Sequence, residues 1–469
     1  MKRDISKGFQ VAGLALVVGL SLSFSARAET LADALASAYE HSGLLQQNRA
    51  LLRAADEDVA IAVSGLRPII SWTSDVTRSF GRNRNSTGST SPESTDVNLG
   101  ITGQLLLYDF GRTRLQIESQ KELVLATRQG LISVEQQVLF RAVQAYMNVR
   151  RNTEVVAIRQ NNLRLLGEEL RAAKDRFEVG EVTRTDVAQA EARLANARSG
   201  LALAQGDLTQ AVEEFRAAIG RRPGNLIPPS RLPRLSGDVE AAKGVAVRRH
   251  PDMLQAQHNV AVADLNIAVA KAATRPTVNL AARLNAGEEI GGSNYSRNGT
   301  VGVEISGPIY QGGRLSAATR QAMAQRDAQR GALHEVRHTV KQNVGNAYAN
   351  LRAAQAAAIA GEEGVRAATV AFRGVREEAK LGARTTLDVL DTEQELLDAR
   401  ANLISAQVDV YIAAYGVLAA TGELTAKDLN LGVKTYDPTA YYNLVKDAPV
   451  NNSKQGKKLD KVLRALGKN

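Results

Sequence analysis

The sequence predicts a mainly α-helical protein with a small β part, built from two similar halves that each contain a helix, a β-hairpin and two long helices. Three observations predict this fold. An eight-residue stretch occurs twice, 202 residues apart, as Gly180–Val187 and Gly382–Val389. A heptad spacing of apolar residues follows each copy, and two runs of alternating apolar and polar residues precede each copy. A period of about 200 residues indicates a duplicated domain, because solenoid repeats are much shorter.

Residues 1–28 have the pattern of a secretory signal peptide. Basic residues come first, an apolar run spans Val11–Leu22, and Ala26-Arg27-Ala28 provides a small-residue cleavage site before Glu29. The apolar run is short for a membrane-spanning helix, so a cleaved signal is favoured over an uncleaved anchor. No later run of 18 apolar residues predicts a transmembrane helix. The mature chain is therefore expected to be exported.

Two β-hairpins are predicted at equivalent places in the two halves, at about 69–108 and about 277–310. A helix over 31–67 precedes the first of them and ends before Pro68. Each strand alternates apolar with polar residues, and the polar positions include Asp75, Arg283 and Glu304. The apolar positions are Ile70, Trp72, Val76, Phe80, Val97, Leu99, Ile101, Leu105, Leu107, Val278, Leu280, Ala282, Leu284, Val301, Val303 and Ile305. Strands of about ten residues with one apolar face are typical of outer-membrane barrels.

Four strands are too few to close a membrane barrel, which needs at least about eight. If these strands cross a membrane, several chains must contribute to one barrel, so this interpretation predicts a homo-oligomer. The alternative is a soluble four-stranded sheet packed on the helices. The charged residues on the polar side of the strands count against that alternative, as does the lack of a helix with an apolar face reserved for a sheet.

The long helices are predicted from spacing. A proline-free stretch from 113 to about 178 forms a rod of roughly 100 Å. The chain turns at Val179-Gly180 and returns along a heptad seam, which predicts a coiled coil. The seam positions are Val187, Ala190, Leu194, Ala197, Leu201, Ala204, Leu208, Ala211, Phe215 and Ala218, and in the second half Val389, Thr392, Leu396, Ala399, Leu403, Ala406, Val410, Ala413, Val417 and Ala420. The turns therefore lie at the end farthest from the strands.

These patterns set the boundaries of the chain's parts, which are a signal at 1–28, a first repeat at 29–220 with its tip at 178–186, a connecting segment at 221–238, a second repeat at 239–422 with its tip at 380–388, a C-terminal connecting segment at 423–445 and a basic tail at 446–469. The formal charge of +10 is mostly terminal, because 1–28 contributes +3 and 446–469 contributes +5. The tail is expected to be disordered and solvated. No nucleic-acid partner is expected.

One motif suggests a different chemistry. His334-Glu335-Val336-Arg337-His338 fits H-E-x-x-H, which on a helix can bind zinc with the glutamate as general base. Its counterpart in the first half, at 132–136, lacks the histidines, and no third ligand is evident. The chain also has no cysteine. We therefore expect no metal site, no cofactor and no catalytic residue.

Several motifs occur in order in both halves and resemble those of the TolC family of outer-membrane efflux proteins. A Tyr-x-x-Gly-Arg junction follows the second and fourth strands, at 108–112 and 310–314. Ala-Tyr-x-Asn occurs at 145–148 and 347–350, and Arg-Phe-x-Val-Gly-x-Val-x-x-Thr-Asp-Val spans 176–187. The resemblance covers roughly residues 30 to 445.

The resemblance implies a homotrimer in which four strands from each chain form a 12-stranded β-barrel in the outer membrane, continued by a long α-helical barrel in the periplasm. It implies docking of the tips, at Val179, Gly180, Leu381 and Gly382, onto a periplasmic adaptor (a membrane fusion protein) and an inner-membrane transporter of RND or ABC type. The implied function is multidrug efflux, type I protein secretion, or both. Such a duct is passive, so its energy comes from the inner-membrane partner.

The resemblance also assigns a gate to the tips. Asp186 and Arg384 match a polar pair that ties the coils together in the closed state. Asp388 and Asp391 match carboxylates that form rings at the narrowest point. One departure concerns Ala379, which occupies a position where the family's gate can carry a tyrosine. Polar ties are therefore expected to hold this gate.

A second class of function stays open on the sequence alone. The chain could be a structural coiled-coil protein of the periplasm or cell surface that has no pore. Extraction distinguishes the two classes, because a channel fractionates with the outer membrane as a heat-modifiable oligomer. A scaffold without membrane strands would be released by osmotic shock.

Overall fold

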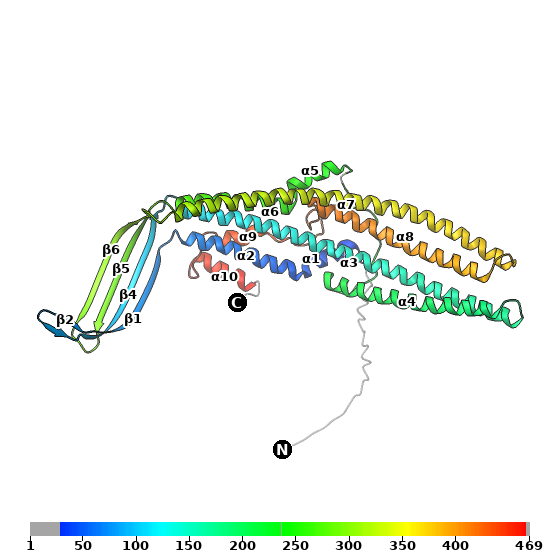
Figure 1. Cartoon of the computed structure of the whole chain (residues 1–469), viewed down its shortest axis with the longest axis horizontal. Helices are drawn as coiled ribbons and strands as arrows, with labels where there is room; N and C mark the ends of the chain where they lie inside the picture. The colour runs from blue at the N-terminus through cyan, green and yellow to red at the C-terminus, as the bar shows by residue number, and fades with distance from the viewer. Residues whose placement is uncertain (1–28, 236, 466–469) are drawn as a thin grey trace, which may run out of the picture.

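The structure is a computed structural model that describes residues 29–235 and 237–465, so the predicted signal peptide lies outside the described residues. A four-stranded sheet projects from one end of a long bundle of helices (Figure 1). The helices α3 and α7 run from the sheet to the opposite end, where each reverses into a second helix. The mainly helical fold with a small β part is confirmed.

The two halves have the same order of elements, as the repeat predicted. The first half comprises α1 (Leu31–His41), α2 (Gly43–Ser64), β1 (Ile69–Phe80), β4 (Glu93–Tyr108), α3 (Arg112–Glu178) and α4 (Arg184–Ile219). The second comprises α5 (Val239–Arg249), α6 (Pro251–Ala272), β5 (Thr277–Glu289), β6 (Tyr295–Ser306), α7 (Arg314–Lys380) and α8 (Thr386–Thr421). The helices α3 and α7 both have 67 residues, and α4 and α8 both have 36. A small hairpin of β2 (Asn83–Asn85) and β3 (Gly88–Thr90) occupies the loop between β1 and β4.

The single helix predicted over 31–67 is wrong, because the chain breaks at Ser42. The Ser42 hydroxyl accepts a hydrogen bond from the backbone N–H of Leu45 at 3.2 Å and so caps the start of α2. In the second half His250 caps α6 in the same way, and Pro251 occupies the first helical position. A capping side chain satisfies an N–H that has no partner within the helix. The two halves of the chain thus interrupt the helix at equivalent places with different capping residues.

The sheet has the order β1-β4-β5-β6 and is antiparallel throughout. Its register places Trp72 opposite Ile101 and Ile101 opposite Leu284, so apolar side chains from three strands share one face. The alternate row pairs Ser71 with Thr102 and Thr102 with Arg283 on the other face. The predicted alternation is therefore confirmed as two distinct faces.

The apolar face of the sheet is open. The side chain of Trp72 is 73% exposed and that of Val301 is 76% exposed. Among the described residues no helix covers either face (Figure 1). A soluble sheet packed on the helices, the alternative considered from the sequence, is therefore wrong for this chain. The strands β1 and β6 are the two edges of the sheet and lack a neighbour on their outer side.

The main core lies midway along the helices and explains the Ala-Tyr-x-Asn motif. Tyr146 of α3 is fully buried, and its hydroxyl donates to the backbone oxygens of Glu29 at 2.8 Å and Ile227 at 2.6 Å. Its ring packs against Phe215 of α4, with centroids 6.4 Å apart. The equivalent Tyr348 of α7 is buried in a second cluster between α5, α7 and α8. The tyrosines of the repeated motif thus contribute to the core of each half, midway along the helices.

The helix α8 is long and apolar enough to cross a membrane by length and composition, which no run of 18 apolar residues had suggested. In this single chain, 33% of the most apolar 18-residue stretch of α8 is buried. The buried residues Val389, Leu396 and Val417 belong to the predicted heptad seam, and Leu390 and Leu397 extend the apolar surface to a second side. Within the chain α8 packs on α7 and α3, and most of its most apolar stretch is not buried.

The basic tail is partly helical, so the disorder predicted for 446–469 is wrong for the described part. A short helix α9 (Pro438–Val445) is followed by α10 (Lys454–Ala465). Leu459 and Leu463 of α10 pack against the buried cluster that contains Tyr441 and Val445 of α9. The disorder was predicted from the charge of the tail alone. The two leucines lie four residues apart, so they give α10 an apolar side.

Candidate gate and docking site at the helix tips

The chain reverses direction twice at the end farthest from the sheet (Figure 1). The first reversal joins α3 to α4 and the second joins α7 to α8. Gly180 has φ of +83° and Gly382 has φ of +77°. The N–H of Glu181 donates to the backbone oxygen of Arg176 at 2.9 Å, and the N–H of Ala383 donates to that of Glu378 at 3.0 Å. Both tips therefore use the same left-handed glycine cap.

Each tip presents an exposed apolar residue just before its glycine. The side chain of Val179 is 72% exposed and that of Leu381 is 86% exposed. Both residues end their helices and lie outside the coil-to-coil packing. These two bulky apolar side chains make the tips candidates for contact with a partner protein.

Asp186 and Asp388 occupy equivalent positions in the two halves and each completes a capping box. The backbone N–H of Thr183 donates to Asp186 Oδ2 at 2.8 Å, and the N–H of Thr385 donates to Asp388 Oδ2 at 3.0 Å. In return each threonine hydroxyl accepts from the aspartate N–H. Each threonine hydroxyl also donates to the carboxylate, at 2.7 Å for Asp186 and 2.9 Å for Asp388. The hydrogen bonds that the hydroxyl and backbone N–H donate to each carboxylate lower the pKa of both aspartates, so both are ionised at neutral pH.

Arg384 has a local partner in its own tip. Its Nε donates to Glu378 Oε2 at 2.9 Å. Within one chain, therefore, the structure does not bring Arg384 together with Asp186, although the resemblance pairs them. Arg384 is exposed and Asp186 is partly exposed, so both are accessible to a neighbouring chain.

Asp391 joins the two helical hairpins. Its carboxylate forms an ion pair with Arg193 of α4, whereas Asp388, one turn earlier on α8, caps its own helix. The two aspartates lie three residues apart, so they share one side of α8. Of the four residues predicted for the gate, Asp391 alone makes a tie between hairpins within the chain.

Two further polar residues near the tips were not predicted from the sequence. Glu393 of α8 is only 6% exposed, and its Oε1 accepts a hydrogen bond from Asn162 Nδ2 of α3 at 3.1 Å. Burial raises the pKa of Glu393 to about 7, even though the hydrogen bond from Asn162 acts in the opposite direction. In sequence, Glu393 falls between Leu390 and Leu397 on the second apolar side of α8. A carboxylate at that position was the sequence feature that could have identified this buried residue.

The pair lies beside a small polar cavity enclosed by α3, α4 and α8. The cavity has a volume of about 270 Å³. Arg159 and Arg193 line it together with Asn196 and Gln394. Asn162–Glu393 and Arg193–Asp391 thus form adjacent polar ties between the α3–α4 hairpin and α8. We call these two pairs the hairpin ties.

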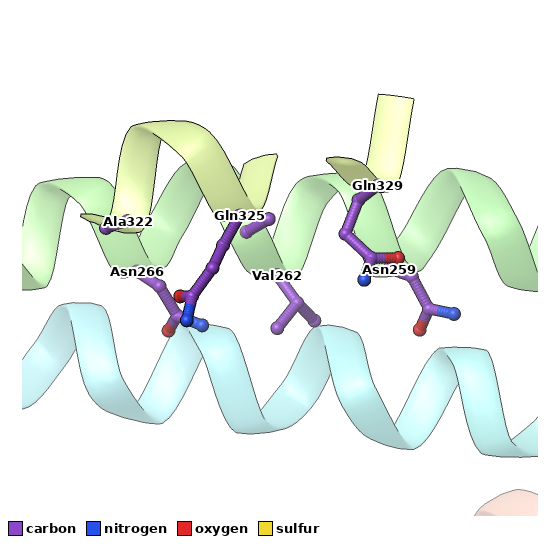
Figure 2. Close-up of a pocket in the computed structure, with 7 residues that line it drawn as sticks. Asn259, Val262, Asn266, Ala322, Gln325 and Gln329 are labelled. Atoms are coloured by element: carbon purple, nitrogen blue, oxygen red, sulfur yellow. The ribbon is translucent and has the colours of Figure 1, made fainter. Parts of the chain in front are cut away.

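A second hollow lies nearer the sheet, is lined by residues of α6 and α7, and has a volume of about 450 Å³ (Figure 2). Amide side chains from α6 and α7 dominate its lining, and none of its lining residues carries a titratable group. Ser119 of α3 donates to Asn266 Oδ1 at 3.0 Å at this place. The hollow is therefore a neutral polar gap between helices and offers no acid–base chemistry.

The residues of the H-E-x-x-H motif lie on α7 in the middle of a continuous helix. His334, Glu335 and His338 are all exposed. Among the described residues no group of three or more His, Cys, Asp or Glu side chains is arranged to hold a metal ion.

The chain is similar to known outer-membrane channels. The family model described as outer membrane efflux protein matches residues 34–221 and 244–423. The chain is 37% identical to the outer membrane efflux protein BepC of Brucella suis, over 93% of this chain and 95% of that protein. It is 27% identical to the outer membrane protein TolC of Vibrio cholerae, over 88% and 96%. It is also 27% identical to the alkaline protease secretion protein AprF of Pseudomonas aeruginosa, over 64% of each chain.

Solved structures agree on the fold. The chain superposes on CusC with a TM-score of 0.73 at 18% identity, covering 83% of this chain and 91% of CusC. It superposes on VceC of Vibrio cholerae with a TM-score of 0.70 at 20% identity, covering 84% and 96%.

Proposed function

This chain belongs to the outer membrane efflux protein family, and from that premise we propose that three copies of it close one 12-stranded barrel. The protein is an outer-membrane export channel whose helices extend into the periplasm. The observation that carries the trimer is a sheet with an exposed apolar face and two unpaired edges, β1 and β6. Pairing of β6 in one chain with β1 in the next removes every edge.

We propose that the tips dock onto a periplasmic adaptor and, through it, onto an inner-membrane transporter of RND or ABC type. The docking residues are Val179, Gly180, Leu381 and Gly382, since both tips present the same exposed apolar surface. The relative BepC, an outer membrane efflux protein, supports a role in efflux, and AprF, a protease secretion protein, supports export of polypeptides. The tunnel is a passive path, so the transporter supplies the energy.

The proposed gate has two layers of polar ties. Between neighbouring chains, Asp186 of one tip pairs with Arg384 of the next, since the two are oppositely charged and neither is buried. Within each chain the hairpin ties hold α8 against α3 and α4. Ala379 leaves no aromatic side chain at the second tip, so these polar ties carry the closed state.

The Asn162–Glu393 tie makes this gate sensitive to pH. While α8 is packed, burial keeps the pKa of Glu393 near 7, whereas a solvated glutamate titrates near 4.5. Opening the hairpins therefore releases a proton, and the packed state loses stability as pH rises from about 4.5 to 7, by roughly 3 kcal/mol at most. The charged groups nearest this carboxyl are Glu169 on α3, Arg376 on α7, Arg159 and Arg193 in the adjacent cavity and Asp391 on α8.

We expect the open probability of the purified channel in planar bilayers to rise between pH 4.5 and 7. The variant Glu393→Gln keeps a hydrogen-bonding side chain without the titration, so it should stay mostly closed across this range. The exposed Glu395→Gln on the same helix serves as the matched control and should keep the wild-type profile. If Glu393→Gln and wild type show the same pH profile, the hairpin tie is not part of the gate.

A further inference from the structure

The turn between α9 and α10 lies beside the start of the sheet. The guanidinium group of Arg67 donates to the backbone oxygens of Asp447 and Ala448 in this turn. Arg67 is two residues before Ile69, where β1 begins. The turn therefore lies at the end of the sheet from which the helices descend, which in the proposed orientation is the periplasmic surface of the membrane.

The packing of α9 and α10 fixes which side of α10 remains free. The Tyr441 hydroxyl donates to Glu57 Oε1 at 2.6 Å, and Tyr441 and Val445 bury the apolar side of α9 against Ala60 of α2. The apolar side of α10, with Leu459 and Leu463, packs in turn on α9. The side of α10 that faces solvent is therefore the charged one.

That free side is strongly basic. The exposed cations of the turn and of α10 are Lys446, Lys454, Lys457, Lys458, Lys461 and Arg464. Against them stand two acidic residues, Asp447 and Asp460. Among the described residues none of these six cations takes part in an ion pair. The turn also presents Val450 as an exposed apolar side chain.

The neighbouring ends of the strands have the residues of a membrane interface. Tyr108 ends β4, and both it and Tyr310, which follows β6, are exposed. The guanidinium group of Arg275, just before β5, lies 5.5 Å from the centre of the Phe110 ring. Aromatic and basic side chains gather at the level of the lipid headgroups in membrane proteins. The α9–α10 turn is at this same level because it contacts Arg67.

We propose that the α9–α10 turn and the lysines in the first turns of α10 bind anionic phospholipid headgroups of the periplasmic leaflet of the outer membrane. This inference rests on the proposed orientation of the channel. A lysine near an anionic surface is attracted to it, and the attraction falls off within a Debye length of roughly 10 Å. Of the cations on α10, Lys454, Lys457 and Lys458 are nearest the turn, whereas Arg464 lies about 15 Å from Lys454 along the helix. Val450 is placed to enter the headgroup region beside them.

Lysine labelling of the full-length trimer in lipid nanodiscs tests this proposal. Discs of phosphatidylcholine alone are compared with discs that also contain phosphatidylglycerol, and labelling is read by mass spectrometry. We expect Lys454, Lys457 and Lys458 to label several-fold more slowly in the anionic discs, and high salt should restore their labelling. Lys380, at the tip and far from the membrane, should label equally in both. Equal labelling of the three lysines in both discs would overturn the proposal, while failure of the chain to enter discs at all would instead overturn the proposed function.

Variants separate charge from fold. Replacing Lys454, Lys457 and Lys458 together with glutamate should release co-purified phosphatidylglycerol, measured by native mass spectrometry, and replacing all three with arginine should retain it. Equal retention in the two triple variants would contradict the lipid site. Protection of the lysines that appears only when a periplasmic protein is added, and not with anionic lipid, would assign this surface to a protein partner and would also overturn the proposal.

Discussion

Replacing Gly382 with valine is expected to abolish export while leaving the trimer intact. Gly382 has φ of +77°, a conformation that costs a residue with a Cβ roughly 1 to 2 kcal/mol and a β-branched one more. No atom lies within 4 Å of the position of an added Cβ, so the effect arises from the backbone and not from a clash. Relief of the strain changes the turn and moves Leu381, the most exposed apolar residue of the tips. Export of a reporter substrate and capture of the adaptor should both fall to background.

The matched control is Gly291→Val. Gly291 has φ of +82°, also with open space around its Cβ position, but it lies in the loop between β5 and β6 at the opposite end of the molecule. The strain is therefore similar, and export should persist. Gly180→Val at the first tip should behave like Gly382→Val. Normal export by Gly382→Val, with the trimer present on unheated gels, would show that the tips are not the docking site.

The double variant Asp388→Ala with Asp391→Ala is expected to lower cation selectivity and to abolish block by multivalent metal ions added on the periplasmic side. Threefold symmetry brings two carboxylates from each chain to one axis, and such rings attract cations. The half-blocking concentration of a trivalent cation should rise at least about tenfold, the change that a loss of 1.4 kcal/mol of binding produces. Planar bilayer recordings measure both quantities.

Two controls separate the ring from other roles of these side chains. Asp388 also completes a capping box, whose loss costs about 1 kcal/mol of local stability, and Thr385→Val removes the hydroxyl of this capping box while both carboxylates of the ring stay in place. Asp398→Ala removes a carboxylate farther along α8, where it accepts from Gln394 at 3.0 Å. Neither control should change selectivity or block. If the double variant keeps both properties, Asp388 and Asp391 act only as a helix cap and as the partner of Arg193.

Local patterns predicted the parts of the fold that depend on short-range periodicity. The alternation around Trp72 and Val301 identified the strands and the open apolar face, because the two faces of each strand are in contact with different environments. The glycines at 180 and 382 identified the reversals, since a left-handed cap needs a residue without a Cβ. The repeat then placed the second half from the first.

Contacts between elements far apart in the sequence were not accessible to the same reasoning. The tie between Asn162 and Glu393 joins residues 231 positions apart, so its formation depends on how the two hairpins pack. The helix α10 was concealed because its lysines dominate the composition of the tail, while two leucines decide its packing. The break at Ser42 depends on one capping bond rather than on a helix-breaking residue.

Disulfide trapping between the sheet edges tests the trimeric barrel most directly. The chain has no cysteine, so Trp72→Cys in β1 can be combined with Val301→Cys or Val303→Cys in β6 without interference. Within one chain β1 and β6 are separated by β4 and β5, a span of about 14 Å, which exceeds the reach of a disulfide. A bond between these positions must therefore join two chains. We expect oxidation in outer membranes to give covalent dimers and trimers and no larger species in at least one register. Monomers alone in every register, or a ladder beyond the trimer, would contradict a closed barrel of three chains.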